Sequence, residues 1–183
     1  YFSLIDGLTL QKTNPEYGIH FGGGANNAFV YDWEFNLRHP ILSKREVRYA
    51  LCLAVNRTAC WEKAYFGIPD VTLSTAPWHK AISWAWDPNV KPILMNVAEA
   101  NRLLDEAGYR RGPDGLRFSI DIVYEIRDYN IKTAEIIREN LKQVGVDLKL
   151  RPCDRVAWDN AMFLKWDFDT GIRTYATFPI EIA

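Results

Sequence analysis

Residues 117–151 read RFSIDIVYEIRDYNIKTAEIIRENLKQVGVDLKLR, and this stretch decides the fold class. Over 117–124, apolar side chains alternate with polar ones, which is the period of a half-buried strand. From about Ile131 to Gly145, apolar residues recur every three or four positions and predict a helix. Alternation returns over 146–151 and predicts a second strand. Two strands joined by one helix in so short a stretch indicate a right-handed βαβ unit with parallel strands.

The segments on either side of this unit extend the same pattern. Aromatic residues alternate over 28–36 and predict a strand, and a further strand is expected over 167–175. Helices are predicted after a capping box that begins at Ser43, after Asn96, and after Asp154. We therefore expect an α/β fold, with a mixed sheet and helices packed on it.

The composition excludes several classes of protein. The chain has 183 residues, of which 48% are hydrophobic and 25% charged, as in an ordinary soluble globular protein. These values exclude intrinsic disorder, collagen and low-complexity repeats. The first residue is Tyr1 and no closing element follows the final predicted strand, which together favour an excerpt of a longer protein. Prolines and tryptophans crowd residues 67–95, which are predicted to form a long loop.

Charge and cysteine spacing exclude further functions. The formal net charge is −1, so the chain offers no electrostatic footprint for nucleic acid. Cys52, Cys60 and Cys153 show no CxxC spacing and no histidine close to them, and no metal site is predicted. The sequence also has no apolar run near 18 residues that would predict a membrane span. No phosphate-binding glycine motif is present, and no cofactor is predicted.

Two regions could carry chemistry or binding. Asp167 and Asp169 lie two apart on a predicted strand, which leaves a hydrolase open, although such carboxylates are more often solvated. The run from Trp158 to Tyr175 gathers aromatic and cationic residues near a strand end. Ligands bind at the carboxyl ends of strands in α/β sheets, and aromatic walls with a few polar groups are typical of binding clefts. The edge of a core with surface charges would show the same pattern.

Four blocks of the sequence resemble one protein family. They are VRYAL with AVNR at 47–51 and 54–57, LLDEAGY at 103–109, VGVDL at 144–148, and Trp158 with the later Phe-Asp pair at 168–169. In this order and spacing they resemble the family 5 extracellular solute-binding proteins, which serve dipeptide, oligopeptide and nickel ABC importers. This chain has Asn56 where the family usually has Asp.

The resemblance implies a two-lobed protein that closes on its ligand. Residues 28–183 would form an α/β ligand-binding lobe, the second lobe of a type II periplasmic-binding-protein fold, and 1–27 an irregular lead-in segment. The chain would serve as the substrate-binding component of an ABC importer and not as an enzyme. Its expected partners are a peptide or other small solute, an ABC permease and the missing first lobe, with no nucleic acid. The location would be periplasmic or extracellular, with membrane association through the transporter.

The resemblance also implies ligand contacts from three places in this lobe. These are the loop after the first strand of the βαβ unit, the Trp-bearing helix and the last strand. The corresponding residues are Asp128, Asn130, Trp158, Lys165, Arg173, Tyr175 and Thr177. Peptide-binding relatives place an acidic residue near Thr177 to bind the peptide amine, and no Asp stands there in this chain. A ligand other than a free peptide therefore stays open, as does a ligand-sensing domain of a transcription regulator.

Overall fold

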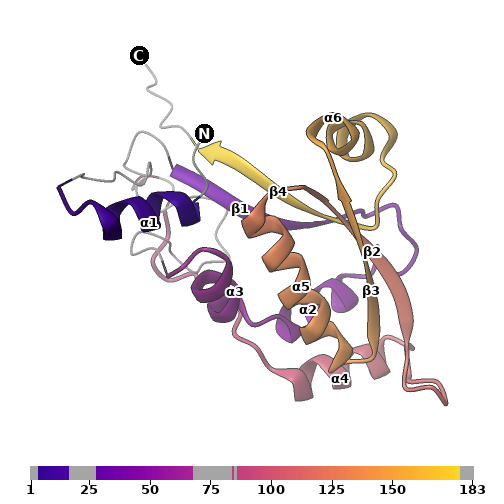
Figure 1. Cartoon of the computed structure of the whole chain (residues 1–183). Coiled ribbons are helices and arrows are strands. Elements are labelled where there is room, and N and C mark those ends of the chain that lie inside the picture. Colours follow the sequence, from indigo (N-terminus) through magenta and orange to yellow (C-terminus); the bar gives the residue numbers. More distant parts are fainter. Residues whose placement is uncertain (1–3, 17–27, 68–83, 85, 178–183) are drawn as a thin grey trace.

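A computed structural model of the chain describes residues 4–16, 28–67, 84 and 86–177 (Figure 1). The helices are α1 (Leu4–Thr13), α2 (Arg45–Ala54), α3 (Arg57–Ala64), α4 (Val97–Glu106), α5 (Asp128–Lys142), α6 (Arg155–Asp159) and the π-helical turn η1 (Asn160–Lys165). The strands are β1 (Ala28–Phe35), β2 (Phe118–Glu125), β3 (Val146–Cys153) and β4 (Thr170–Thr177). They form one sheet in the order β1-β4-β2-β3. The expected α/β fold with a mixed sheet is confirmed.

The register of the sheet confirms the predicted βαβ unit. β2 and β3 are parallel, with Phe118 opposite Val146, and α5 connects them. β4 is parallel to β2 but antiparallel to β1, so that Ala28 lies opposite Thr177. The first and last residues of the four-stranded sheet therefore lie side by side.

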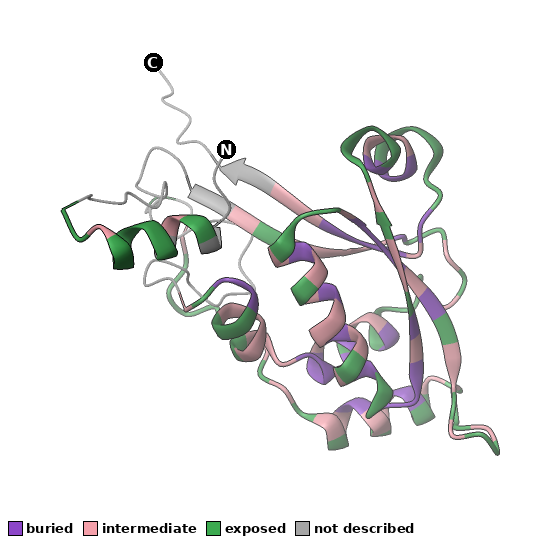
Figure 2. Cartoon of the chain, viewed as in Figure 1, coloured by how far each residue is buried: buried purple, intermediate pink, exposed green. Residues whose placement is uncertain are grey.

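The core lies between the sheet and the helices α2, α4 and α5. Ile122 of β2, Leu51 of α2 and Leu141 of α5 belong to one buried cluster and are fully buried. Because side chains alternate along a strand, Val123 points to the opposite face, where it packs with Trp158 and Met162. In Figure 2 the buried residues concentrate where α2 and α5 meet the strands. The sheet is thus covered on both faces, by a large layer on one side and by α6 with η1 on the other.

The predicted helix starts are only partly confirmed. Asn96 and Asp154 cap α4 and α6 through side-chain oxygens that accept from the backbone N–H of the third residue of each helix. The capping box at Ser43 is wrong, because the Ser43 hydroxyl donates to the carbonyl of Pro40 at 2.9 Å and Lys44 is the N-cap residue. α5 begins at Asp128, three residues before the predicted start, because the polar first turn carried no apolar stripe.

Two expectations fall partly outside the described residues. The segment 1–27 was expected to be irregular, and that is wrong for Leu4–Thr13, which form α1. Gly7 and Thr9 are poor helix formers, so residue propensity did not predict this helix. Most of the long loop predicted at 67–95 lies outside the described residues, and the domain boundary at residue 28 stays a prediction.

Candidate ligand-binding site

The last strand has an edge that no other strand covers. β4 pairs with β2 only at Thr170 and Gly171, opposite Ile122 and Val123, and it separates from β2 before β2 ends at Glu125. From Ile172 to Thr177, β4 pairs with β1 on one side and with no strand on the other among the described residues. The chain leaves β2 through α5 towards β3 and returns through α6 and η1 to β4 on the other side of β2. Such a reversal of strand order at the carboxyl ends is where ligands bind in α/β sheets.

A close contact holds η1 against β4. A Cβ atom at Gly171 would lie 2.5 Å from Met162 Sδ and 2.6 Å from Met162 Cε, which is too close for two non-bonded atoms. Met162 is 2% exposed and packs against Val123 in the smaller core cluster. The absence of a side chain at Gly171 therefore allows η1 to lie directly on the sheet.

We expect Gly171→Ala to lower the free energy of unfolding by about 1–3 kcal/mol, because the added methyl overpacks this contact. Chemical denaturation followed by circular dichroism would measure the change. The matched control is the double variant Gly171→Ala with Met162→Ala, in which the smaller side chain makes room for the methyl. Strict additivity of the two single losses in the double variant would contradict the contact.

Aromatic and cationic side chains connect α6, η1 and β4. The guanidinium of Arg155 lies 5.0 Å from the ring centroid of Trp158. Trp158 meets Phe163 edge to face, with ring centroids 5.3 Å apart. The guanidinium of Arg173 lies 5.5 Å from the ring centroid of Phe163. We call these four residues the aromatic-arginine row, and it brings together two residues expected from the sequence, Trp158 and Arg173.

Both guanidinium groups of the row are paired with carboxylates. Arg173 donates to Glu34 of β1 at 2.8 Å. Arg155 donates to Asp159 one turn further along α6 at 2.9 Å and lies 3.8 Å from Glu125 at the end of β2. Neither arginine therefore presents an uncompensated charge to a ligand.

A hollow of about 560 Å³ is lined by residues of β3, α6 and η1. Lys165 lines it, and its ammonium has no ion-pair partner among the described residues. Arg151 also lines it but donates to Asp121 at 2.5 Å and to Asp167 at 3.1 Å. Cys153 completes this wall, and burial raises the pKa of its thiol, which keeps the sulfur protonated and unreactive.

The two carboxylates that could have indicated a hydrolase, Asp167 and Asp169, both bind other residues of the chain. Asp167 and Asp169 precede β4 and do not share a strand face, which corrects the expected placement. Asp167 binds Arg151, whereas Asp169 accepts from the backbone N–H of Asp121 at 2.9 Å and lies 3.5 Å from His39. Since the two carboxylates have separate partners, they do not form an acid–base pair.

The remaining expected site residues lie at the carboxyl ends of the strands. Asp128 is exposed in the first turn of α5, and Asn130 is 4% exposed. The amide of Asn130 donates to the carbonyl of Glu125 at 3.1 Å, which attaches the start of α5 to the end of β2. Tyr175 and Thr177 are residues of β4, and their side chains lie outside the described part of the chain.

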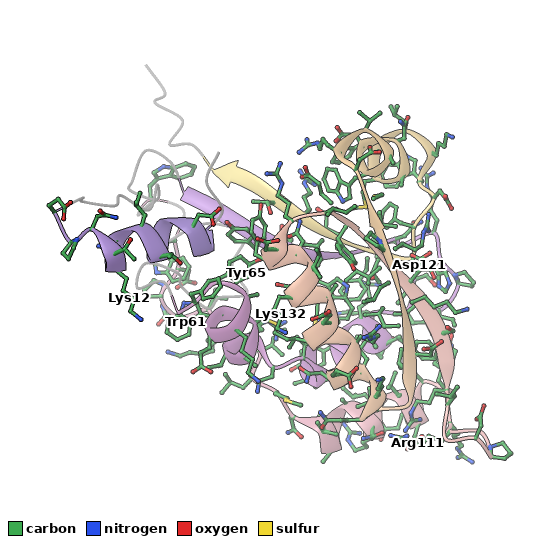
Figure 3. All side chains as sticks on the ribbon, viewed as in Figure 1. Lys12, Trp61, Tyr65, Arg111, Asp121 and Lys132 are labelled. Carbon is green, nitrogen blue, oxygen red and sulfur yellow. The ribbon has the colours of Figure 1, made fainter. Side chains whose placement is uncertain are left out.

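Sequence reasoning missed a cluster of three tyrosines at the same end of the sheet. Tyr31 of β1, Tyr65 after α3 and Tyr129 of α5 have ring centroids 4.6–5.8 Å apart. Figure 3 shows Tyr65 between α3 and the start of α5. Burial, and secondarily the neighbouring Tyr129, raise the pKa of Tyr31 to about 12, so the hydroxyl stays neutral. The alternation of aromatic residues in β1 marked Tyr31 alone, because the three tyrosines are far apart in sequence.

Metal-binding clusters and membrane-crossing helices are absent from the part of the chain that the structure describes. No group of three His, Cys, Asp or Glu residues in it is arranged to hold a metal ion. None of its helices combines the length and the apolar character that a bilayer crossing needs.

The fold and the family follow from comparison with known proteins. The mixed sheet with helices on both faces is the fold of type II periplasmic binding proteins. The model of bacterial extracellular solute-binding proteins, family 5 Middle, matches residues 4–180. The chain therefore belongs to the family 5 bacterial extracellular solute-binding proteins, and the resemblance seen in the sequence is confirmed.

Similar proteins and structures agree with this assignment. The chain is 26% identical to the probable ABC transporter periplasmic-binding protein SapA of Escherichia coli, over 93% of this chain and 30% of SapA. It is 24% identical to the di/tripeptide-binding protein 1 of Pseudomonas aeruginosa, over 90% of this chain and 31% of that protein. The oligopeptide-binding protein AppA of Bacillus subtilis, solved with a nonapeptide, has a TM-score of 0.75 at 22% identity, over 93% and 36%. DppA of Helicobacter pylori, solved with the peptide STSA, has a TM-score of 0.77 at 21% identity, over 93% and 31%.

Each comparison covers most of this chain but only part of the related protein. Nearly all of this chain is matched, but it spans only about a third of the length of the curated relatives. The likeness to the solved structures supports the fold of this part of the molecule.

Proposed function

We propose that this chain forms the second lobe of the substrate-binding component of an ABC importer, which captures a peptide or a similar small solute between two lobes. The uncovered edge of β4 from Ile172 to Thr177 carries the proposal. An exposed strand edge offers backbone N–H and C=O groups in a row, and an extended peptide binds such an edge as an added strand. Its backbone groups are recognised whatever its side chains are.

The relatives support the partners and the location that we propose. SapA is named an ABC transporter periplasmic-binding protein, and another relative is named a di/tripeptide-binding protein. Since this chain spans about a third of their length, a further lobe would supply the other wall of the cleft. Closure of the two lobes around the ligand would remove it from water, and the closed form would deliver it to a membrane permease. Such a protein works in the periplasm or outside the cell.

We propose that the expected site residues act around the uncovered edge of β4. Asp128 would contact the ligand from the start of α5, which Asn130 attaches to the end of β2, and Lys165 and Arg173 would contact it from η1 and β4. Tyr175 and Thr177 belong to the uncovered edge itself. Trp158 would act indirectly, because its buried ring packs against Phe163.

The alternatives receive no comparable support. The family is one of solute-binding proteins, and we propose that this member binds its ligand without chemical turnover. A regulatory role would require a fused DNA-binding domain, and with a net charge of −1 this part offers no electrostatic footprint for nucleic acid.

We expect backbone methylation of a peptide ligand to weaken binding at alternate positions. Trialanine and its singly N-methylated forms would be titrated into the intact two-lobed protein by isothermal calorimetry. A peptide that adds as a strand turns every second N–H towards β4, so methylation there should raise the Kd at least about tenfold. Methylation at the positions between serves as the matched control and should change the Kd little.

Two results would contradict the proposal. Equal effects of methylation at every position would exclude strand addition along β4. No binding of trialanine or of any other short peptide would exclude the peptide as ligand.

A further inference from the structure

Phe163 is the ring of the aromatic-arginine row that meets solvent. It is 45% exposed, whereas Trp158 is 4% exposed. Their rings stand edge to face at 86°, with centroids 5.3 Å apart. Trp158 was the aromatic side chain expected to touch the ligand, but its burial leaves Phe163 in the position to make that contact.

We propose that Phe163 makes the site selective for ligands with an apolar or aromatic side chain at one position, in preference to a charged one. The proposal rests on the proposed function, because it requires an extended ligand along the uncovered edge of β4. It concerns which peptides are bound and goes beyond the recognition of their backbone.

The geometry of β4 places one ligand side chain beside Phe163. Side chains alternate along a strand, and Ile172 lies in the main core, so Gly171 and Arg173 face the opposite side, where η1 lies. A strand added at the uncovered edge has the same alternation, and one of its side chains on this face lies next to Arg173, since β2 covers the edge at Gly171. The Arg173 guanidinium lies 5.5 Å from the centroid of the Phe163 ring. A ligand side chain next to Arg173 would therefore be near Phe163 as well.

The charges around Phe163 disfavour a charged ligand side chain. Arg173 is paired with Glu34 at 2.8 Å, and Arg155 is paired with Asp159 at 2.9 Å. A ligand carboxylate would have to displace one of these carboxylates, and a ligand ammonium would meet a guanidinium over the ring. An apolar side chain covers the exposed face of Phe163 without breaking either pair.

Lys165 provides the competing possibility. Its ammonium has no ion-pair partner among the described residues, and it lines the hollow towards β3 together with Arg151 and Cys153. If the ligand side chain reached that hollow and not Phe163, the site would prefer a carboxylate. The two arrangements therefore predict opposite preferences.

The test measures side-chain preference in the intact two-lobed protein by isothermal calorimetry. Trialanine is compared with tripeptides that carry Phe, Leu, Glu or Lys at one of the three positions and Ala at the others. At one position we expect Phe and Leu to bind at least about tenfold more tightly than Glu and Lys, the size of effect that burial of one apolar side chain provides. In Phe163→Ala this ratio should fall below about threefold.

Two variants control for folding and for general loss of apolar surface. Leu164→Ala removes a neighbouring side chain that is 73% exposed and should keep the preference. Phe163→Leu keeps an apolar side chain at the site and should retain most of it. Circular dichroism confirms that each variant is folded.

Several results would overturn the proposal. These are a preference for Glu, equal affinity for all side chains at every position, or an undiminished preference in Phe163→Ala. Each of them leaves the proposed function intact, since the peptides still bind. Failure of every peptide to bind would overturn both.

Discussion

Replacing Arg117 with methionine should lower the free energy of unfolding by about 3 kcal/mol or more. The side chain of Arg117 is 2% exposed and donates to the carbonyls of Val144, at 2.8 Å, and Tyr109. It also donates to the side chains of Asn101, at 3.0 Å, and Asp105. Methionine fills a similar volume but leaves the part-buried carbonyls of Val144 and Tyr109 without this donor, and each such loss costs about 1–3 kcal/mol. Urea denaturation would measure the change.

Arg102→Met is the matched control for this prediction. Arg102 is paired with Glu99 and Glu106 on the exposed face of α4, where ion pairs contribute little to stability. The urea midpoint of unfolding of Arg102→Met should therefore stay close to that of the unmodified chain. A second readout concerns Asp105, whose pKa the hydrogen bond from Arg117 holds below its usual range. In Arg117→Met that pKa should rise to the usual range in a carbon-detected NMR titration. An unchanged stability together with an unchanged Asp105 pKa would contradict the role of Arg117.

Gly145→Ala should be the most damaging single-methyl change in the described chain, with a loss of about 2–4 kcal/mol. Gly145 ends α5 with φ of +73°, a conformation that costs an L-residue about 1–2 kcal/mol. A Cβ atom there would also lie 2.6 Å from the carbonyl oxygen of Gly115 and 3.0 Å from Arg111 Nη1. Figure 3 shows Arg111 at this end of the molecule, and its guanidinium donates to the carbonyl of Gln143. The backbone oxygen cannot yield as a flexible side chain would, so the overlap adds to the conformational penalty.

Gly108→Ala separates these two effects. Gly108 follows α4 with φ of +93°, but a Cβ atom there would meet nothing within 4 Å. This variant should lose only the conformational part, about 1–2 kcal/mol. Equal losses for Gly108→Ala and Gly145→Ala in thermal denaturation would show that the contact with Gly115 contributes nothing.

The elements of the fold were predicted where a pattern is local. The alternation in β2 and β3, the apolar period of α5 and the glycines after α4 and α5 each depend on residues within one or two turns. Those predictions were confirmed because burial of one face imposes a period of 2 or 3.6 on the sequence. The exact start of α5 was wrong, because its polar first turn carries no apolar stripe. The cap of α2 was wrong, because the Ser43 hydroxyl donates to Pro40, a choice that neighbouring residues alone do not decide.

The candidate site was less accessible to sequence reasoning. Trp158 and Arg173 were both named in advance, but the sequence did not reveal that Trp158 is buried and that Phe163 is exposed in its place. Glu34 alternates with the aromatic residues of its strand and so faces away from the main core, but the sequence does not indicate a role for it at the site. Its pairing with Arg173 joins residues at opposite ends of the chain, and no local pattern reports such a contact.

The sequence by itself determined the α/β class, the βαβ unit and the membership of a solute-binding family. All three depend on hydrophobic periods or on short blocks of residues. These periods and blocks are local, so they can be recognised in the linear sequence. Only the tertiary structure decided that β4 lies between β1 and β2 and extends past the end of β2. That arrangement leaves one strand edge uncovered and brings Arg173 of β4 close to the Phe163 ring. Its cause is the packing of Met162 on Gly171 and the pairing of β1 with β4, which join segments that are distant in sequence.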